Sequence, residues 1–269
     1  MLFRSFPVNV AGSLGRHITT TLGSGGPKVR AITTNGGGES LSAKTVLDEV
    51  VPAFEKLRQQ GKTRFLGITA VGDTAALHQV IDARVFDSAQ VSYNMLNPSA
   101  GSALPAGYPA QDYGKMFDHT QSAGVGVVGI RVLAGGALSG AAERHPIASP
   151  PPDPIGSAHS YDADMQRARR LSPLVQQGHA GSLPEAAVRF AISHPAMGTI
   201  LVGMATPQQF EDALPLFKKV RCHPPHSVAC QGCYTHSLAS RGDRHERSSA
   251  ESSYYPEEKA RLIGLLVDS

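Results

Sequence analysis

The chain has 269 residues, with 25 basic and 22 acidic side chains and an apolar share of 41%. That length suits one large α/β domain or two small ones, and the near balance of charge argues against a nucleic-acid partner. No apolar stretch is long enough to cross a bilayer, so we expect no membrane partner. All three cysteines lie between Cys222 and Cys233, which provides no disulfide framework and fits a reducing compartment such as the cytoplasm.

The first 38 residues are rich in Ser, Thr and Gly, and they include basic residues but no acidic one. Such a composition is typical of an organelle transit peptide, and it also fits a disordered N-terminus. We expect residues 1–40 to be a disordered leader of a cytoplasmic protein, with a transit peptide as the alternative.

Helical and strand patterns alternate along the chain after this leader. Apolar residues at helical spacing predict helices over Ser42–Gln60, after Asp73, over Ala110–Ala123 and Ser160–Gln177, and from Ser182 and Thr206 onward. Short apolar runs predict strands at Lys62–Thr69, Val85–Tyr93, Val125–Val132 and Gly198–Gly203. Alternation of this kind means parallel strands joined by crossover helices.

Local signals mark several helix ends and loops. Gly61 sits where the residue after a helix C-terminus belongs. Ser182–Glu185 and Thr206–Gln209 match the capping box, in which side chains bond the free N–H groups of the first turn. Pro173 is a candidate kink in its helix. The proline-rich segment His145–Ser157 is long enough to be an insertion at a barrel rim.

The stretch Gly124–Gly140, GVGVVGIRVLAGGALSG, organises the rest of the chain. Its run Val125–Val132, with Arg131 as the one charged member, predicts a strand buried on both faces. Gly124–Gly129 also spells the G-x-G-x-x-G of a dinucleotide-binding turn, but that fingerprint must follow a strand and open a helix. The glycines in Leu133–Gly140 do follow the strand, so they suit either the close approach of a ligand phosphate or the packing of a helix.

Five segments resemble, in order, motifs of the aldo/keto reductase family. They are Gly61–Thr69 (GKTRFLGIT), Gln90–Leu96 (QVSYNML), Leu133–Gly140 (LAGGALSG), Ala186–Phe190 with Ile200–Gly203 (AAVRF and ILVG), and Thr206–Phe210 (TPQQF). The resemblance extends over Ser42–Phe217, about two thirds of the chain.

The resemblance implies a (β/α)8 TIM barrel that binds a nicotinamide dinucleotide, usually NADPH, at its C-terminal rim. The matched segments correspond to strands five to eight. We therefore expect an α/β fold in which residues 41–217 form a partial barrel, the cofactor-binding half. Phosphate sites in such barrels come from the loops after strands seven and eight and a nearby helix N-terminus, here Leu133–Gly140 and Gly203–Gln209.

Carried over residue by residue, the resemblance implies nine cofactor-binding residues. They are Thr69 and Gln90 at the nicotinamide carboxamide, Leu133, Gly135 and Ala137 at the pyrophosphate, and Gly203, Ala205, Thr206 and Gln209 at the adenosine end. Thr69 and Gln90 also fit the alternative of ordinary polar residues at strand ends.

Three departures from the family pattern bear on the cofactor. Ile130 replaces the aromatic residue that stacks on nicotinamide, and Ala213 replaces a common Asn. Met204–Ala205 lacks a Lys or Arg for a 2′-phosphate, so charge does not favour NADP over NAD. NADP is expected from the resemblance, with NAD as the alternative.

The family's chemistry needs a Tyr acid, a Lys, an Asp and a His, all from the first four strands. Residues 1–39 contain no tyrosine or aspartate, so we assign no catalytic residue. Tyr93 and Tyr113 are interpreted as rim or core aromatics rather than substitutes. We expect a truncated protein with little or no carbonyl reduction alone. Its alternatives are a non-catalytic nucleotide-binding module, or a half that self-associates or needs a partner chain.

The C-terminal region departs from the family as well. Residues 218–253 form a polar tail in which Cys222, His226, Cys230 and Cys233 could hold zinc or could cluster by chance. We assign no metal ligand. Residues 254–269 are predicted to end in a helix.

Overall fold

A computed structural model describes residues 41–141, 143–154 and 156–218, together with the backbone of three short strands at 5–7, 19–21 and 31–35. The predicted terminal helix and the Cys/His tail beyond residue 218 lie outside the described residues.

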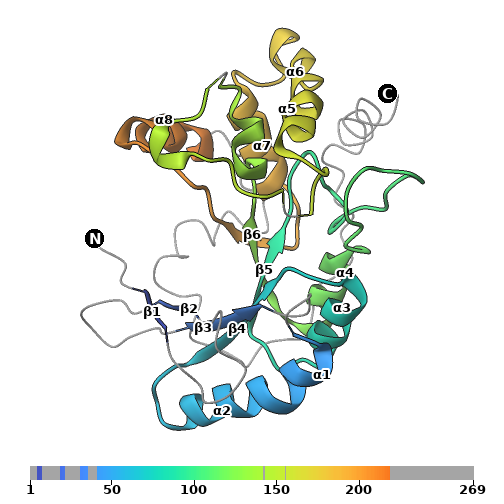
Figure 1. Cartoon of the computed structure of the whole chain (residues 1–269), viewed down its shortest axis with the longest axis vertical. Coiled ribbons are helices and arrows are strands. Elements are labelled where there is room, and N and C mark those ends of the chain that lie inside the picture. The colour runs from blue at the N-terminus through green and yellow to red at the C-terminus, as the bar shows by residue number, and fades with distance from the viewer. Residues whose placement is uncertain are drawn as a thin grey trace.

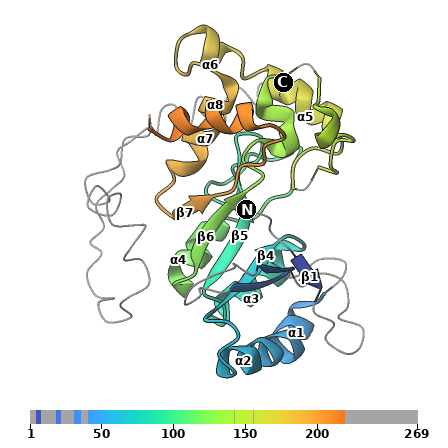
Figure 2. The same ribbon diagram turned by 90° about the vertical axis from the view of Figure 1, so that its left-hand side faces the viewer.

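The described strands form a single sheet of seven strands in the order β1-β2-β3-β4-β5-β6-β7. Their bounds are β1 Ser5–Pro7, β2 Thr19–Thr21, β3 Ala31–Asn35, β4 Phe65–Ala70, β5 Ser88–Ser92, β6 Gly126–Ile130 and β7 Met197–Ile200. Strands β3 to β7 are parallel, and β1 and β2 are antiparallel to their neighbours. Figure 2 shows β4 to β7 side by side. The predicted parallel strands with crossover helices are confirmed.

Helical segments connect the parallel strands. They are α1 Ala43–Thr45, η1 Val46–Val50, α2 Val51–Gln59, α3 Thr74–Asp82, α4 Met116–Ala123, η2 Ala134–Ser139, η3 Pro146–Ala148, α5 Tyr161–Arg169, α6 Pro173–Gln176, α7 Leu183–Ile192 and α8 Pro207–Lys218. Helices α5 to α8 gather beyond the ends of β5 and β6 (Figure 1). In the part of the chain that is described, no helix is both long and apolar enough to cross a membrane.

The first predicted helix forms as expected, although its second turn is a π-helix. The Ser42 hydroxyl accepts from the Thr45 N–H at 3.0 Å, and helical structure continues to Gln59. Gly61 then takes φ +68°, and the N–H of Lys62 bonds the carbonyl of Leu57 at 3.0 Å. This is the Schellman termination that glycine permits at low cost.

Two predicted helices are shorter than expected. Lys115 adopts a left-handed conformation with φ 55°, so α4 begins at Met116 and not at Ala110. The helix predicted over Ser160–Gln177 breaks after Arg169 into α5 and α6. Pro173 starts α6 instead of kinking a continuous helix, because a proline in the first turn leaves no intrahelical hydrogen bond unmade.

The region expected to be a disordered leader contains β1, β2 and β3. Strand β3 pairs with β4 in continuous parallel register, from Ala31 opposite Phe65 to Asn35 opposite Thr69. Strand β4 is therefore not a free edge. The edges of the described sheet are β1 and β7.

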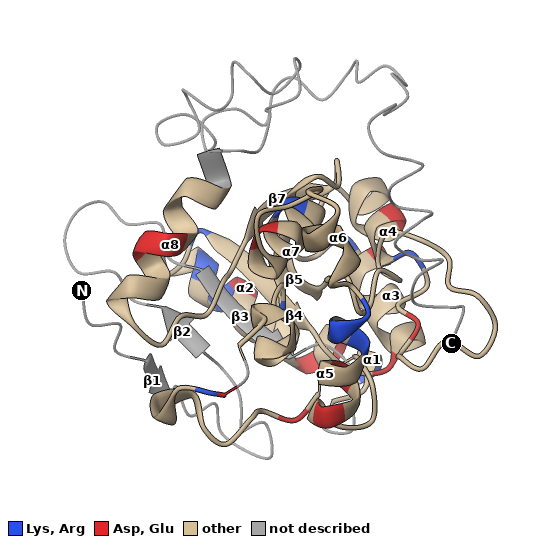
Figure 3. Ribbon diagram, turned by 90° about the horizontal axis from the view of Figure 1, so that it is seen from above, with Lys and Arg blue, Asp and Glu red and all other residues tan. Residues whose placement is uncertain are grey.

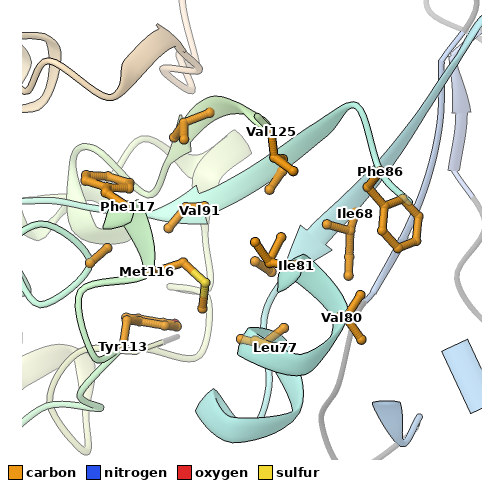
Figure 4. Close-up of a cluster of buried hydrophobic side chains, with 14 of the residues drawn as sticks. Ile68, Leu77, Val80, Ile81, Phe86, Val91, Tyr113, Met116, Phe117 and Val125 are labelled. Carbon is orange, nitrogen blue, oxygen red and sulfur yellow. The ribbon is translucent and has the colours of Figure 1, made fainter. Parts of the chain in front are cut away.

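The main core lies between one face of the sheet and the helices α1 to α4. Leu77, Val80 and Ile81 of α3 are fully buried and point toward the strands that carry Ile68 and Val91 (Figure 4). The apolar stripe predicted for α3 is therefore the stripe that packs on the sheet.

The opposite face of β4, β5 and β6 is only partly covered within the described residues. Along β6, Gly126 is exposed and Val128 and Ile130 are partly exposed, whereas Val127 is buried. The prediction that Val125–Val132 is buried on both faces is therefore wrong. The described helices pack on one face only, so alternate residues of β6 stay in contact with solvent.

Candidate functional site

A cavity of about 860 Å³ opens between the loop after β6 and the segment after β7. One wall runs from Arg131 to Ala148, the other comes from Leu201–Ala205 and one face of α8, and side chains of α5 and α7 line the remainder. The two walls meet because β6 and β7 are parallel neighbours, so their carboxyl ends lie at the same edge of the sheet.

The loop after β6 has an unusual backbone. Ala134, Gly135 and Gly136 are successive residues with φ of 49°, 66° and 105°. A Cβ on Gly136 would lie 2.8 Å from Nη1 of Arg144. Glycine is needed here for the conformation of the loop itself, because L residues rarely adopt such φ values and a side chain would collide with Arg144.

Side chains from other segments hold this loop in place. Nη1 of Arg144 donates to the carbonyl of Gly135 at 2.7 Å, and Nδ2 of Asn94 donates to the carbonyl of Arg131 at 3.0 Å. Ala134, Ala137 and Leu138 pack in a second buried cluster with Met95, Leu96 and residues of α5 and α7. The loop is thus braced by contacts with other parts of the protein.

Five of the nine predicted cofactor-binding residues line the cavity. They are Leu133, Gly135, Gly203, Ala205 and Gln209. Two others contribute differently. Ala137 is 2% exposed and packs inside the second cluster. The hydroxyl of Thr206 caps α8 by accepting from the N–H of Gln209 at 3.2 Å.

The Thr206 half of the capping box predicted at the start of α8 is confirmed, whereas the Gln209 side chain bonds the N–H of Ala205 and not that of Thr206. Besides the bond to Thr206, Oε1 of Gln209 accepts from the N–H of Ala205 at 2.6 Å. The Gln209 side chain is therefore fixed at the cavity wall, with its oxygen engaged by the backbone and its amide nitrogen still able to donate.

Thr69 and Gln90 lie together but outside the lining of the cavity. They are register partners in the β4–β5 pair, and Val128 continues the same row on β6. All three are partly exposed and belong to the less covered face of the sheet. The structure thus forms two groups of predicted residues, one on this face and one in the cavity.

Arg131 is a cavity residue that the sequence prediction did not assign to the site. Its pKa is lowered by burial, while the nearby Tyr113 and Asp153 act in the opposite direction. The available signal was its position, as the single charge in the strand run directly before the glycine loop. Glu143, Arg144 and Asp212 are the other strongly charged residues of the lining.

A comparison with protein families matches residues 32–222 to the aldo/keto reductases, well over half of the chain. The chain belongs to the aldo/keto reductase family. It is therefore related to oxidoreductases that use a nicotinamide nucleotide.

The similar proteins are members of the same family and are longer than the matched region. L-galactose dehydrogenase of Arabidopsis thaliana is 26% identical over 176 residues, which cover 64% of this chain and 47% of the relative. The holo form of an aldo-keto reductase from Bacillus halodurans aligns with a TM-score of 0.49 and 18% identity, covering 74% of this chain and 58% of the other. Glycerol dehydrogenase of Gluconobacter oxydans aligns with a TM-score of 0.46 and 14% identity, covering 80% and 61%. The chain spans about half the length of the curated relative it matches.

An aldo/keto reductase needs a tyrosine that delivers a proton to the carbonyl oxygen. Tyr93 and Tyr113 are both fully buried in the core, which confirms their interpretation as core aromatics. Burial raises the pKa of each phenol; for Tyr113 the Ser92 hydroxyl and Arg131 oppose that shift. Neither hydroxyl lines the cavity, so neither is placed to protonate a ligand bound there.

The structure does not fit the interpretation of Gly124–Gly129 as a dinucleotide-binding turn. Gly124 terminates α4 with φ 71°, and Gly126 is the first residue of β6. The glycines therefore enter a strand instead of joining a strand to a helix. Among the described residues no three His, Cys, Asp or Glu side chains are grouped as metal ligands. The candidate zinc cluster lies beyond those residues.

Proposed function

We propose that this aldo/keto reductase chain binds a nicotinamide dinucleotide in the cavity between the β6 and β7 loops, as the cofactor-binding part of an oxidoreductase. The observation that carries the proposal is that predicted cofactor-binding residues from two separate loops meet at one cavity. Leu133 and Gly135 come from one loop and Gly203, Ala205 and Gln209 from another, yet all five line one cavity. Its size of about 860 Å³ falls in the range of ligand pockets.

The two groups of predicted residues suit the two ends of an extended dinucleotide. The β6 loop would hold the pyrophosphate, and the neutral wall formed by Gly203, Ala205 and Gln209 would hold the adenosine. Thr69 and Gln90 would take the nicotinamide carboxamide, because a hydroxyl and an amide side by side supply both donors and acceptors. Thr206 would contribute indirectly, through the cap that positions Gln209.

The charges at the proposed adenosine end do not favour a 2′-phosphate. From Leu201 to Leu216, Asp212 is the one charged residue among the described residues of the lining. Figure 3 shows the acidic turn of α8, Glu211–Asp212. A phosphate dianion would be repelled here, so we expect NADH to bind at least as tightly as NADPH, although NADP is the cofactor that the resemblance implies.

We further propose that the chain on its own reduces carbonyl compounds weakly or not at all. The motif resemblance implies that residues 41–217 are the second half of a barrel, whereas the family's acid–base residues come from the first half. The buried Tyr93 and Tyr113 give no accessible substitute, and the hydroxyl of Tyr161, which lines the cavity, accepts from Nη1 of Arg144 at 2.8 Å. Cytoplasmic location stays a prediction.

The test is a titration of the purified chain with NADH and with NADPH, following the fluorescence of the reduced nicotinamide. Saturable binding is expected, with Gln209→Ala weakening it by about 2- to 10-fold for a lost hydrogen bond. Gln208→Ala is the matched control, since Gln208 is the preceding residue on α8 and does not itself line the cavity. No binding at millimolar nucleotide would contradict the proposal.

In a second candidate function, this chain is one half of a barrel that another copy of the chain, or a different chain, completes. It is favoured by the partly exposed sheet face, the edge position of β7, and the exposed side chains of Leu201, Phe210 and Leu214. Sedimentation velocity over a range of concentrations should show association, and Phe210→Glu should reduce it. A monomer at every concentration would contradict self-association. Carbonyl-dependent oxidation of NADPH that appears when a chain carrying the first half of the barrel is added would support a partner chain.

A further inference from the structure

Arg131 has a backbone conformation that calls for an explanation. It follows β6 directly and has φ 59°, the left-handed region that L residues other than Asn and Asp rarely enter. Two hydrogen bonds to its carbonyl, from the N–H of Ala134 at 2.7 Å and from Nδ2 of Asn94 at 3.0 Å, hold it there. Strained residues held this firmly are concentrated at ligand-binding sites.

The side chain of Arg131 lies at the cavity wall against the glycine loop. It lines the main cavity and also a small hollow that Pro152 and Asp153 line as well. Its Nη1 lies 3.6 Å from the position that a Cβ on Gly135 would occupy. The guanidinium is thus beside the backbone to which the pyrophosphate is assigned in the proposed function.

The guanidinium of Arg131 makes no hydrogen bond or ion pair within the described part of the chain. Burial nevertheless lowers its pKa, because removing a cation from water disfavours the charged form. Asp153 acts against that shift, but no described carboxylate lies within ion-pair distance of the guanidinium, so its N–H groups remain able to bond a ligand of opposite charge.

Arg144, the other arginine in the lining, has a different role. Its Nε and Nη2 donate to the carbonyl of Ala148 at 2.9 and 2.7 Å, and its Nη1 donates to the carbonyl of Gly135 and the hydroxyl of Tyr161. Its guanidinium also lies 4.9 Å from the ring centre of Tyr161. Arg144 is occupied in bracing the loop, which leaves Arg131, among the described residues of the lining, as the arginine that can meet a ligand.

We propose that Arg131 is the cation that anchors the diphosphate group of a nucleotide in this cavity. The inference rests on the proposed function, in which the β6 loop holds the pyrophosphate, and adds a residue that the family resemblance did not supply. A guanidinium forms paired, charge-assisted hydrogen bonds to phosphate oxygens. The diphosphate belongs at this wall because it carries Arg131 and Arg144 against the exposed Glu143, whereas the opposite wall carries Asp212 as its one charge among the described residues.

Arg131→Gly separates a role in ligand binding from a role in the fold. Glycine adopts φ near +59° without strain, so the variant should unfold at the same temperature as the wild type or higher. It should bind ADP and NADH about 10- to 100-fold more weakly. Arg131→Lys should recover part of the loss, because it keeps the charge but not the planar fork.

Arg84→Gly is the matched control. Arg84 is an exposed arginine after α3, it also has φ 59°, and it does not line the cavity. The same chemical change there should leave nucleotide binding as in the wild type. The readout is calorimetric titration with AMP, ADP, inorganic pyrophosphate and NADH. In the wild type ADP should bind more tightly than AMP, and this advantage should disappear in Arg131→Gly.

The outcomes distinguish the two proposals. If Arg131→Gly binds ADP and NADH as tightly as the wild type, the anchor is overturned while nucleotide binding stands. If the wild type binds ADP and pyrophosphate through Arg131 but gains nothing from nicotinamide, the anchor stands and the nicotinamide function fails. If the wild type binds none of the four ligands, both proposals fail.

Discussion

The two faces of the sheet differ although the same strands make both. On one face, Leu66, Ile68 and Val91 are fully buried beneath the helices. On the other, Thr69 and Gln90 of the same strands β4 and β5 are partly exposed. Because successive residues of a strand point to opposite faces, a difference of one position separates a core residue from a candidate ligand residue.

This difference teaches that stability and ligand binding are separable in this chain. The buried face removes apolar area from water and supplies most of the folding free energy. The partly exposed face contributes little burial, so polar residues are tolerated there. Substitutions on the two faces should therefore have different effects, even when the residues are adjacent in the chain.

The largest expected loss of stability comes from a substitution on the buried face. Ile68→Ala should lower the free energy of unfolding by about 2–5 kcal/mol, because it removes packed methyl and methylene groups and leaves a cavity. Thr69→Ala, at the next position, should cost less than about 1 kcal/mol. Urea unfolding followed by circular dichroism measures both. Equal losses at the two positions would show that something covers the second face as well.

An intermediate effect on stability is expected at high pH, from two tyrosines buried in the core. Burial raises the pKa of Tyr93 and Tyr113 above the ordinary 10.0, so the unfolded chain loses these protons at a lower pH than the folded protein. Their contribution is complete below pH 10 and is lost as the pH rises toward the folded-state pKa values.

The double variant Tyr93→Phe, Tyr113→Phe tests this loss of stability. Neither hydroxyl has a hydrogen-bond partner in the described part of the chain, so removing both should not destabilise the protein at pH 7. The decline in melting temperature above pH 10 should become shallower in the variant. An unchanged decline would mean that other groups cause it.

The smallest effect on stability, and a clear one on binding, is expected on the partly exposed face. Thr69→Ala with Gln90→Ala should weaken NADH binding by about 10-fold, since up to two hydrogen bonds are lost, with little change in melting temperature. Ser88→Ala, on β5 and on the same face, is the control. Unchanged NADH binding would leave Thr69 and Gln90 as ordinary polar residues of a strand end.

Much of the fold followed from local sequence signals. The alternating helices and strands, the stop at Gly61, and the caps at Ser182 and Thr206 all appear in the structure. Each depends on residues within a few positions of one another, whose backbone conformation and hydrogen bonds are decided locally. The late start of α4 was missed because the left-handed Lys115 has no comparable local signal.

The candidate site was predicted only in part, because its motifs are local but its side-chain contacts are not. Motif order pointed to the loops after β6 and β7, and five of the residues do line one cavity. Ala137 was expected at the pyrophosphate, but its side chain packs among Leu138 and Leu96, contacts that depend on how the loop folds back onto α5 and α7. For Arg131, the sequence showed only a charged residue within an apolar run and gave no sign of its place at the cavity.

The sequence by itself determined the class of fold, the family and the position of most elements, because periodicity, turn residues and motif spelling are local properties of the chain. Only the tertiary structure decided which face of each strand is covered and that two distant loops share a cavity. It also decided that the Arg131 guanidinium stands in that cavity with no hydrogen bond to another described residue, while Arg144 is occupied. These features arise from contacts between residues far apart in the chain, and no local pattern specifies such contacts.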